Sequence, residues 1–336
     1  MKTINTRQLL IFYFIYSFAI KFLMLPAFLS VDAGRDAWIA AGIGALIELA
    51  LLFIILMVVE RKRNVKVLMP LMLAFFLIQA LITLAHMNSL LGLTLYENLS
   101  KHMFIIPMLV LGIFFVFSKT RAIFRSGEIF YILILIAIFL AVLPALWKVD
   151  AREVLPVLGG GLGPVLRSVY NNLIYFEGAL VLLMFQGEVR IKKNFKRNFM
   201  IWASAGAIVF TAFVFFFYAL FGPLGGLRQL GIVDVTGQNS YLAQNIRIEW
   251  IIVCVWILLL LIRFGVLFYC CFAAIKRITC TKKIHPAWIA FPLAIIVYIG
   301  FMFIPLAGML GALRLPITIF YFTVPLLFLL IRRKNV

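Results

Sequence analysis

Long apolar stretches constrain this chain more than any other feature of its sequence. Segments such as Leu49–Val59 and Phe130–Ala145 contain no charged residue, and a helix needs about 20 apolar residues to cross the ~30 Å hydrocarbon layer of a bilayer. Strands of a membrane barrel alternate polar and apolar residues, whereas these stretches are apolar on every side. With 65% hydrophobic and 13% charged residues, against roughly 25% charged in soluble domains, the sequence predicts an all-α integral membrane protein.

These stretches predict about ten transmembrane helices in a single polytopic domain that covers residues 1–336. The first stretch is too long for the apolar region of a signal peptide, and a second follows closely, so we expect the first to remain as a helix. The predicted spans are 8–31, 37–59, 67–95, 103–118, 127–147, 165–187, 199–223, 250–274, 287–305 and 315–331.

The distribution of basic residues predicts how these helices are oriented. With the amino terminus inside, the cytoplasmic segments hold 21 of the 31 Lys and Arg residues and a net charge of +18, against +1 for the outer segments. This asymmetry follows the positive-inside rule, so we expect both termini in the cytoplasm. We expect no nucleic-acid partner, because the basic residues are divided among short loops instead of forming one stripe. The cytoplasmic segments are 1–7, 60–66, 119–126, 188–198, 275–286 and 332–336.

Ten helices divide into two halves of five, at about 8–147 and 165–331. Because five is odd, the second half enters the membrane from the opposite face, as an inverted repeat requires. The topology permits such a LeuT-like five-plus-five repeat without showing it. In that architecture the first helix of each half is broken near the midplane and the ligand lies at the breaks, so we expect helices 1 and 6 to be broken.

Four charged residues fall deep within the predicted spans, namely Lys21, Glu48, Glu177 and Arg263. An isolated charge at the bilayer centre costs at least about 2.5–3.5 kcal/mol, so these side chains should face the bundle interior, pair with one another or meet water. Two positive and two negative charges allow complete pairing, and one interpretation is that they only hold helices together. The other is that Lys21 and Glu177 line a ligand or proton site, with Glu48 and Arg263 as supporting charges.

Polar and small residues surround the charges on helices 1 and 6. A serine lies one turn before the lysine, and one of two asparagines shares a face with the glutamate. A glycine directly after the glutamate would ease unwinding, and Pro26 can break helix 1 because it lacks an N–H and clashes with the preceding turn. In the third span, His86 is either a packing residue or a proton relay. The predicted ligand-binding residues are Ser17, Lys21, Asn171, Asn172, Glu177 and Gly178.

The sequence contains no motif of hydrolytic, redox or nucleotide-binding chemistry, so we expect neither enzymatic activity nor a cofactor. The glycine-rich stretch 158–164 is not followed by the Gly-Lys-Ser/Thr of a phosphate loop, and we expect it to be a re-entrant or flexible approach to helix 6. The cysteines have neither CxxC spacing nor a nearby histidine cluster, so they predict packing residues and no metal site. They are Cys254, Cys270, Cys271 and Cys280.

The segment Asp36–Ile39, which reads Asp-Ala-Trp-Ile, resembles an element of the spore-germination permeases, the integral-membrane B subunits of germinant receptors. In that family the element follows a first helix that ends near a Leu-x-x-Pro-like stretch, here Leu23–Pro26. Further matches to the family's sixth and eighth helices extend the resemblance from about residue 5 to 275. They are Leu155-Pro156 with the glycines that follow, Tyr170-Asn171, Phe176–Gly178, Arg247–Glu249, Trp256 and Arg263.

The resemblance implies a member of the amino acid–polyamine–organocation superfamily with the LeuT-like repeat. It implies a nutrient receptor that binds an amino acid or similar small molecule at the midplane, together with a larger A subunit and a lipoprotein C subunit, in the spore inner membrane. A proton-coupled secondary transporter of amino acids or amines is the alternative. One departure concerns the ligand, because the family's first helix usually has a glycine at its break, whereas Ser17–Lys21 contains none.

Overall fold

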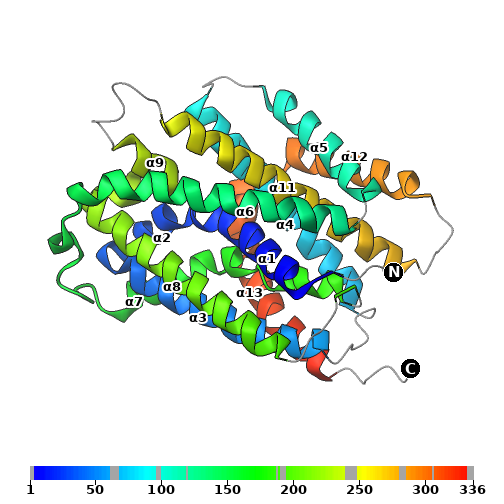
Figure 1. The fold of residues 1–336 in the computed structure, drawn as a ribbon, viewed down its shortest axis with the longest axis horizontal. Helices are drawn as coiled ribbons and strands as arrows, with labels where there is room; N and C mark the ends of the chain where they lie inside the picture. The colour runs from blue at the N-terminus through cyan, green and yellow to red at the C-terminus, as the bar shows by residue number, and fades with distance from the viewer. Residues whose placement is uncertain are drawn as a thin grey trace.

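The computed structural model describes most of the chain as a bundle of helices (Figure 1). Arg247, Cys280, the whole of the predicted cytoplasmic segment 332–336 and parts of the other cytoplasmic segments lie outside the described residues. The described residues are 4–60, 68–95, 100–118, 120–186, 188–189, 194–238, 248–279, 285–304 and 306–330.

The described residues are helical apart from turns, loops and one isolated bridge between Ile4 and Val189. The α-helices are α1 Thr6–Lys21, α2 Leu25–Ala33, α3 Ala37–Glu60, α4 Met69–Thr94, α5 Lys101–Phe117, α6 Thr120–Val142, α7 Leu162–Asn172, α8 Phe195–Phe221, α9 Gly231–Gly237, α11 Ile248–Ile278, α12 Ala287–Phe303 and α13 Leu306–Leu330. Short 3₁₀-helices join them, namely η1 Gly34–Asp36, η3 Leu143–Lys148, η4 Ala151–Val154, η5 Leu173–Phe176, η6 Leu180–Phe185 and η7 Gly222–Leu227.

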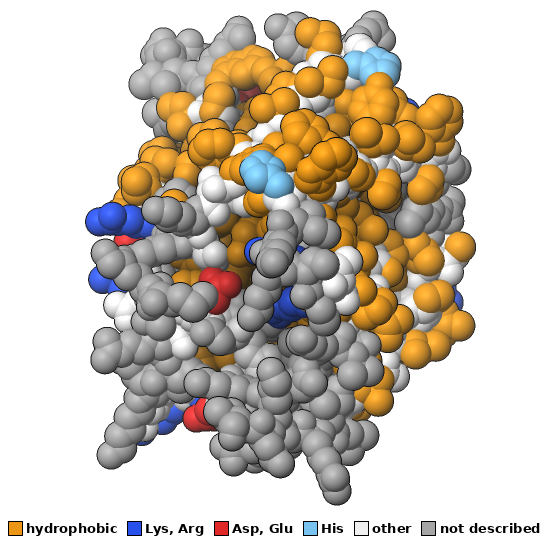
Figure 2. Space-filling view, turned by 90° about the vertical axis from the view of Figure 1, so that its right-hand side faces the viewer, with side chains coloured by type: hydrophobic (Ala, Val, Ile, Leu, Met, Phe, Trp, Pro, Cys, Tyr) orange, Lys and Arg blue, Asp and Glu red, His pale blue; other side chains and the backbone are white. Residues whose placement is uncertain are grey.

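The outer surface of the bundle is that of a protein surrounded by lipid. Large hydrophobic side chains such as Ile129, Ile208 and Phe303 are more than half exposed, and Figure 2 shows hydrophobic side chains over much of the upper and right-hand parts of one face. Soluble monomers rarely expose such broad apolar patches. Six helical segments in the described part are long and apolar enough to cross a bilayer, which confirms an all-helical, multi-pass membrane protein. They are Leu25–Glu60, Met69–Thr94, Ala122–Lys148, Leu162–Phe185, Phe195–Leu227 and Glu249–Ile278.

Of the remaining predicted spans, the first is interrupted, 103–118 and 287–305 correspond to the shorter helices α5 and α12, and the last corresponds to α13. The count of ten crossings stays a prediction. The last span was predicted to begin at residue 315, but α13 already begins at Leu306. Arg314 is therefore a helical residue; it is exposed, and its guanidinium donates to the side-chain oxygen of Asn171 at 2.9 Å. The seven-residue helix α9, within the segment 224–249 that was predicted to lie outside the membrane, was not predicted.

The first predicted span is interrupted between α1 and α2, at residues 22–24. Pro26 stands at the start of α2 and has no N–H to offer the carbonyl of Phe22 four residues earlier. Helix α9 replaces that donor, because the backbone N–H of Ile232 donates to the Phe22 carbonyl at 3.0 Å. Gly231 permits the approach, since a Cβ there would lie 2.8 Å from the same carbonyl oxygen. The break is therefore stabilised by a specific neighbour.

The sixth predicted span is interrupted as well. Helix α7 ends at Asn172, and the chain continues through η5, a short non-helical stretch at Glu177 and then η6. Side chains from two other helices bind the carbonyls of this stretch: Gln79 of α4 donates to Ile174 at 3.0 Å, and the Tyr321 hydroxyl of α13 donates to Phe176. Irregular backbone inside a membrane protein requires such internal partners.

The segment that resembles the family element fastens the approach to α7. The carboxylate of Asp36 accepts the backbone N–H of Leu158 at 2.8 Å, and the Arg35 guanidinium donates to the carbonyl of Leu155 at 2.6 Å. The glycine-rich stretch then turns at Gly161, whose φ of 78° favours glycine. These contacts fix the start of α7 against the turn between α2 and α3.

Candidate functional site

The four charges within the predicted spans form two ion pairs at the centre of the bundle. Lys21, the last residue of α1, pairs with Glu48 of α3, and Arg263 of α11 pairs with Glu177 in the break after η5. The four residues are 4%, 3%, 2% and 0% exposed in the order given. Breaking such a pair by removing one partner leaves an uncompensated buried charge, which costs about 3–5 kcal/mol. Lys21 and Glu177, which the sequence analysis singled out together, thus belong to different pairs.

The Lys21–Glu48 pair is completed by hydroxyl groups and aromatic rings. Tyr13 and Ser17, which lie two turns and one turn before Lys21 on α1, donate to the same oxygen of Glu48 at 3.1 and 3.4 Å, respectively. The ammonium lies 5.2 Å from the ring centroid of Phe176, within the range of a cation–π interaction. The Glu48 carboxylate therefore has three donors, all from α1.

The Arg263–Glu177 pair joins both interrupted helices. The Tyr16 hydroxyl donates to the two carboxylate oxygens of Glu177 at 2.9 and 3.1 Å. Arg263 also donates to the backbone carbonyl of Tyr16 at 2.6 Å, and its guanidinium lies 4.2 Å from the Tyr16 ring centroid. Trp256, two turns earlier on α11, donates to the Ala19 carbonyl at 3.1 Å. One face of α11 thereby holds the end of α1.

Helix α4 supplies the remaining polar groups of this region. Thr83 accepts from Nε of Arg263 at 3.3 Å, and the side-chain oxygen of Gln79 accepts from its Nη2 at 3.4 Å. One turn beyond Thr83, His86 packs on Tyr175 with ring centroids 5.5 Å apart. The buried Nε2 atom of His86 has no hydrogen-bond partner among the described residues.

The break after η5 meets helices α1 and α3 at Gly178. A Cβ at this position would lie 3.0 Å from a carboxylate oxygen of Glu48 and 3.1 Å from the hydroxyl oxygen of Ser17. Glycine therefore lets the backbone after Glu177 lie directly against the side chains of α1 and α3. We refer to Ser17, Lys21, Glu48, Glu177, Gly178 and Arg263, with Tyr13 and Tyr16, as the central cluster.

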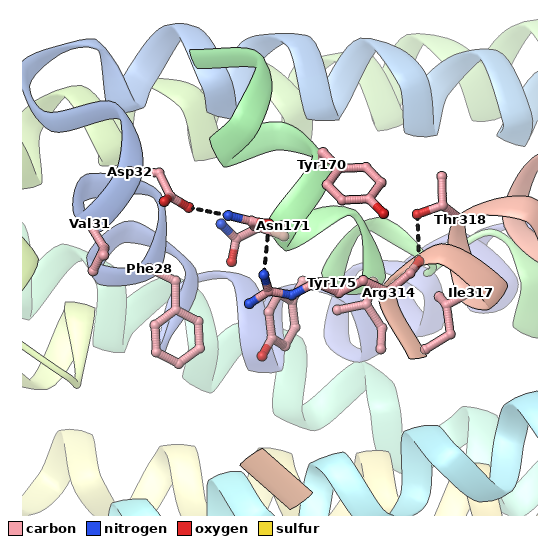
Figure 3. A pocket seen from close by; sticks show the side chains of 11 residues that line it. Phe28, Val31, Asp32, Tyr170, Asn171, Tyr175, Arg314, Ile317 and Thr318 are labelled. Atoms are coloured by element: carbon pink, nitrogen blue, oxygen red, sulfur yellow. Dashed lines mark hydrogen bonds between the residues drawn. The ribbon is translucent and has the colours of Figure 1, made fainter. Parts of the chain in front are cut away.

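The two predicted asparagines lie outside the central cluster, in a cavity of about 250 Å³. Asn172 is buried and donates back to the Ser168 carbonyl at 2.9 Å. Asn171 lies between two charged side chains: its amide nitrogen donates to Asp32 at 2.8 Å, and its oxygen accepts from Arg314 at 2.9 Å (Figure 3). We call this cavity the α2–α7–α13 pocket; it is lined by Phe28, Val31, Asp32, Tyr170, Asn171, Asn172, Ile174, Tyr175, Arg314, Ile317 and Thr318.

The predicted ligand residues therefore fall into two groups, four in the central cluster and two in the pocket. Sequence reasoning missed Asp32 and Arg314, because both were counted among charges of the outer segments. It also missed Tyr13 and Tyr16, whose hydroxyls are not distinguished from lipid-facing tyrosines by sequence alone. A usable signal was present, since Tyr13, Ser17 and Lys21 follow one another at intervals of four residues along one helical face.

Side chains of the metal-binding kind are scattered in this region. Across the described residues, no three His, Cys, Asp or Glu side chains come together in a way that would hold a metal ion. The buried carboxylates are instead neutralised by Lys21 and Arg263. Within this part of the chain, the arrangement is suited to switching hydrogen bonds and ion pairs between helices.

Comparison with known families gives one match, and it covers almost the whole chain. The family model described as spore germination protein matches residues 3–306, which include both interrupted helices, both ion pairs and the Asp36–Ile39 element. A search of the curated proteins finds no match. The chain belongs to the spore germination permease family, a family of non-enzymatic membrane proteins.

Proposed function

We propose that this protein is the membrane-embedded, ligand-sensing subunit of a germinant receptor and that it binds a small molecule such as an amino acid at the membrane midplane. The observation that carries the proposal is the close approach of Gly178, in the second interrupted helix, to Ser17 of the first and to Glu48 of α3. Interrupted helices that meet at mid-depth expose backbone and side-chain groups for a ligand, as in transporters. Family membership supports the role in germination.

The architecture we propose is the ten-helix LeuT-like inverted repeat, with halves at about 8–147 and 165–331. Two observations support it: the interruption after Lys21 and the interruption at Glu177 fall in the first helix of each half. The excess of basic residues in the cytoplasmic segments supports cytoplasmic termini. Figure 1 agrees with an even number of crossings, since α1 begins and α13 ends toward the same end of the bundle.

In this proposal the ligand binds between the breaks and favours one arrangement of the helices over another. Ser17, Lys21, Glu177 and Gly178 would contact it, while Glu48 and Arg263 hold the charges in place. A ligand that enters here must supply the hydrogen bonds that it displaces, because unpaired buried charges are costly. A polar, charged small molecule such as an amino acid meets that requirement.

The second candidate function is proton-coupled transport of amino acids or amines. It is favoured by the two buried carboxylates, each held by one cation and by tyrosine hydroxyls. If a substrate took over Lys21 or Arg263, the released carboxylate could take up a proton and carry it between the two sides. Both functions use the same central cluster, so only a measurement of flux separates them.

As partners we propose an A-type membrane subunit and a C-type lipoprotein in the spore inner membrane. Family membership is the support for these partners. Co-purification of the affinity-tagged chain from spore membranes would test them: a second membrane protein and a lipoprotein in equal amounts support the receptor, and a chain that purifies alone counts against it.

The binding proposal is tested by a thermal-shift screen of the purified chain in lipid nanodiscs against amino acids, nucleosides and sugars. We expect an amino acid to raise the melting temperature. Gly178→Ala should weaken its binding at least about tenfold, because the methyl group pushes the break after η5 away from Ser17 and Glu48. Gly163→Ala is the matched control, since a Cβ there meets open space. Failure of every compound to bind would overturn the proposal.

Transport is tested with the same protein in liposomes. Uptake of the labelled amino acid that depends on an imposed pH gradient would favour the carrier. Binding without uptake would favour the receptor. An inactive preparation is excluded by showing that the reconstituted protein still binds the amino acid.

A further inference from the structure

We propose that the α2–α7–α13 pocket binds the two charged backbone groups of an amino acid, the ammonium on Asp32 and the carboxylate on Arg314. The inference rests on the proposed function in one respect, namely that the ligand is an amino acid. It adds a second place for that ligand, separate from the central cluster, and it names the groups that recognise it.

Asp32 and Arg314 carry opposite charges in one pocket without forming an ion pair. Both ion pairs found among the described residues lie in the central cluster. Asp32 is partly buried at the end of α2, and Arg314 lies on α13 across the cavity. The half-buried Asp32 and the exposed Arg314 are bridged by the neutral amide of Asn171. The pocket therefore offers one protein charge of each sign to a ligand that takes the place of this amide.

Such a ligand would replace the hydrogen bonds that Asn171 now forms with Asp32 and Arg314. The amide nitrogen of Asn171 donates to Asp32 at 2.8 Å, and its oxygen accepts from Arg314 at 2.9 Å, so that the three side chains follow one another across the pocket (Figure 3). An amino-acid zwitterion has a donor and an acceptor of the same polarity, but both are fully charged. The two bonds to Asn171 are already charge-assisted, since one group of each is ionised. A zwitterion would add an attraction between opposite full charges at each end.

The rest of the pocket suits an apolar side chain of modest size. Phe28, Val31, Ile174 and Ile317 line it beside the polar groups. The cavity of about 250 Å³ lies just below the roughly 300–1,000 Å³ of pockets for drug-sized molecules. The chemical class that fits is therefore a small aliphatic amino acid with both backbone charges free.

The pocket is linked to the central cluster through Gln79. The Ile174 carbonyl at the pocket wall accepts from the Gln79 amide at 3.0 Å, and the Gln79 oxygen accepts from Arg263 at 3.4 Å. Tyr175 lines the pocket and packs on His86, whose buried Nε2 has no partner in the described part of the chain. An amino acid bound in the pocket thus lies next to polar groups that continue toward the central cluster.

The competing explanation is a latch: the three side chains would only fasten α2, α7 and α13 to one another. A latch and a binding site make different predictions for ligand analogues. In a latch, removing a charge from the protein lowers stability and leaves the preference among analogues unchanged. In a binding site, each protein charge matters only for the ligand charge that it contacts.

The probes are L-valine, isobutylamine, which keeps only its ammonium, and isovalerate, which keeps only its carboxylate. Binding to the full chain in nanodiscs is measured by isothermal titration calorimetry. We expect L-valine to bind best and each analogue to bind at least about tenfold more weakly, as for the loss of one hydrogen-bonded charge.

The decisive variants are Arg314→Gln and Asp32→Asn. Arg314→Gln should weaken L-valine at least about tenfold and leave isobutylamine unchanged, whereas Asp32→Asn should weaken L-valine and leave isovalerate unchanged. Arg167→Gln, at an exposed arginine of α7 that does not line the pocket, is the matched control. Equal melting temperatures without ligand show that the variants are folded.

Equal weakening of L-valine and isobutylamine in Arg314→Gln, or no weakening of either, would overturn the pocket assignment. If the affinity for L-valine is unchanged in both pocket variants but falls in Gly178→Ala, the pocket assignment fails and the proposed function stands. If neither L-valine nor any other amino acid binds the wild-type chain, both fail together.

Discussion

Replacing Lys21 by Met separates the structural work of this lysine from a role in ligand binding. The substitution keeps much of the side-chain volume and removes the ammonium, so that Glu48, which is 3% exposed, loses the cation with which it pairs. Removal of one partner from a buried pair costs about 3–5 kcal/mol. Tyr13 and Ser17 still donate to Glu48, and we therefore expect the lower end, about 3 kcal/mol of unfolding free energy.

A second substitution, Glu48→Gln, should restore most of that loss in the Lys21→Met background. The neutral amide no longer requires a cation, and its oxygen can accept from the same two hydroxyl groups. We expect the double variant to lie within about 1 kcal/mol of the wild type, because replacing a whole buried pair is often nearly neutral.

The free energies are measured by unfolding the purified chain in mixed micelles with increasing SDS, followed by circular dichroism. Lys101→Met, at an exposed lysine of α5, is the control and should change stability by less than about 0.5 kcal/mol. A single variant as stable as the wild type, or a double variant no better than the single one, would refute the reasoning from pairing. The folded double variant is then used to measure binding of the amino acid. A loss of affinity in this variant would indicate that Lys21 contacts the ligand.

Three further predictions concern other parts of the same framework. Gly231→Ala should destabilise the chain by about 1–3 kcal/mol, because the added methyl would lie 2.8 Å from the Phe22 carbonyl oxygen; SDS unfolding measures it. Tyr16→Phe removes the hydroxyl that donates to Glu177, and we expect a loss of about 1.5–3 kcal/mol in the same assay. Burial raises the pKa of Asp234 above its usual value of 3.8, so the folded state holds this proton more tightly than the unfolded state, and stability should fall as pH rises from about 3.8 through the raised pKa. The melting temperature of Asp234→Asn, followed against pH beside the wild type, should lack that component; identical profiles would contradict it.

The sequence allowed prediction of the helices and of where two of them break. Apolar runs report the spans directly, since every lipid-facing helix must be apolar along its length. The break of the first span was predictable from Pro26, because a missing N–H is a local property. The neighbour that completes this break could not be predicted from the sequence. Ile232 is more than 200 residues distant from Phe22 along the chain, and α9 is a short helix whose position depends on packing.

The buried charges, too, were predictable in part from the sequence and in part only from the packing of the helices. Two cations and two anions in hydrocarbon predict pairs, but which cation meets which anion depends on the contacts of the helices. Lys21 reaches Glu48 of α3 although α1 packs mainly on α6, α8 and α11, and Arg263 reaches Glu177 because α11 packs on both α1 and η6. No periodicity within one helix carries that information.

The pocket could not be found from the sequence for a different reason. Asp32 and Arg314 stand near predicted helix ends, where charges ordinarily face water. Only the structure shows that Asn171 lies between them. The sequence alone does not distinguish a charge at a span boundary that only faces water from one that also binds a side chain of another helix.

The hydrogen bonds of the central cluster limit how this protein can change shape. Each ion pair joins an interrupted element to a continuous helix, and Arg263 additionally binds the Tyr16 carbonyl of α1. A small displacement of α1 would therefore weaken the donors to Glu48 and Glu177 together. Because an unpaired buried charge costs several kcal/mol, intermediate positions are unfavourable, and a second stable arrangement must exchange whole partners. Packed interiors of this kind are bistable instead of continuously deformable, so a ligand can select a state only by replacing particular donors or acceptors.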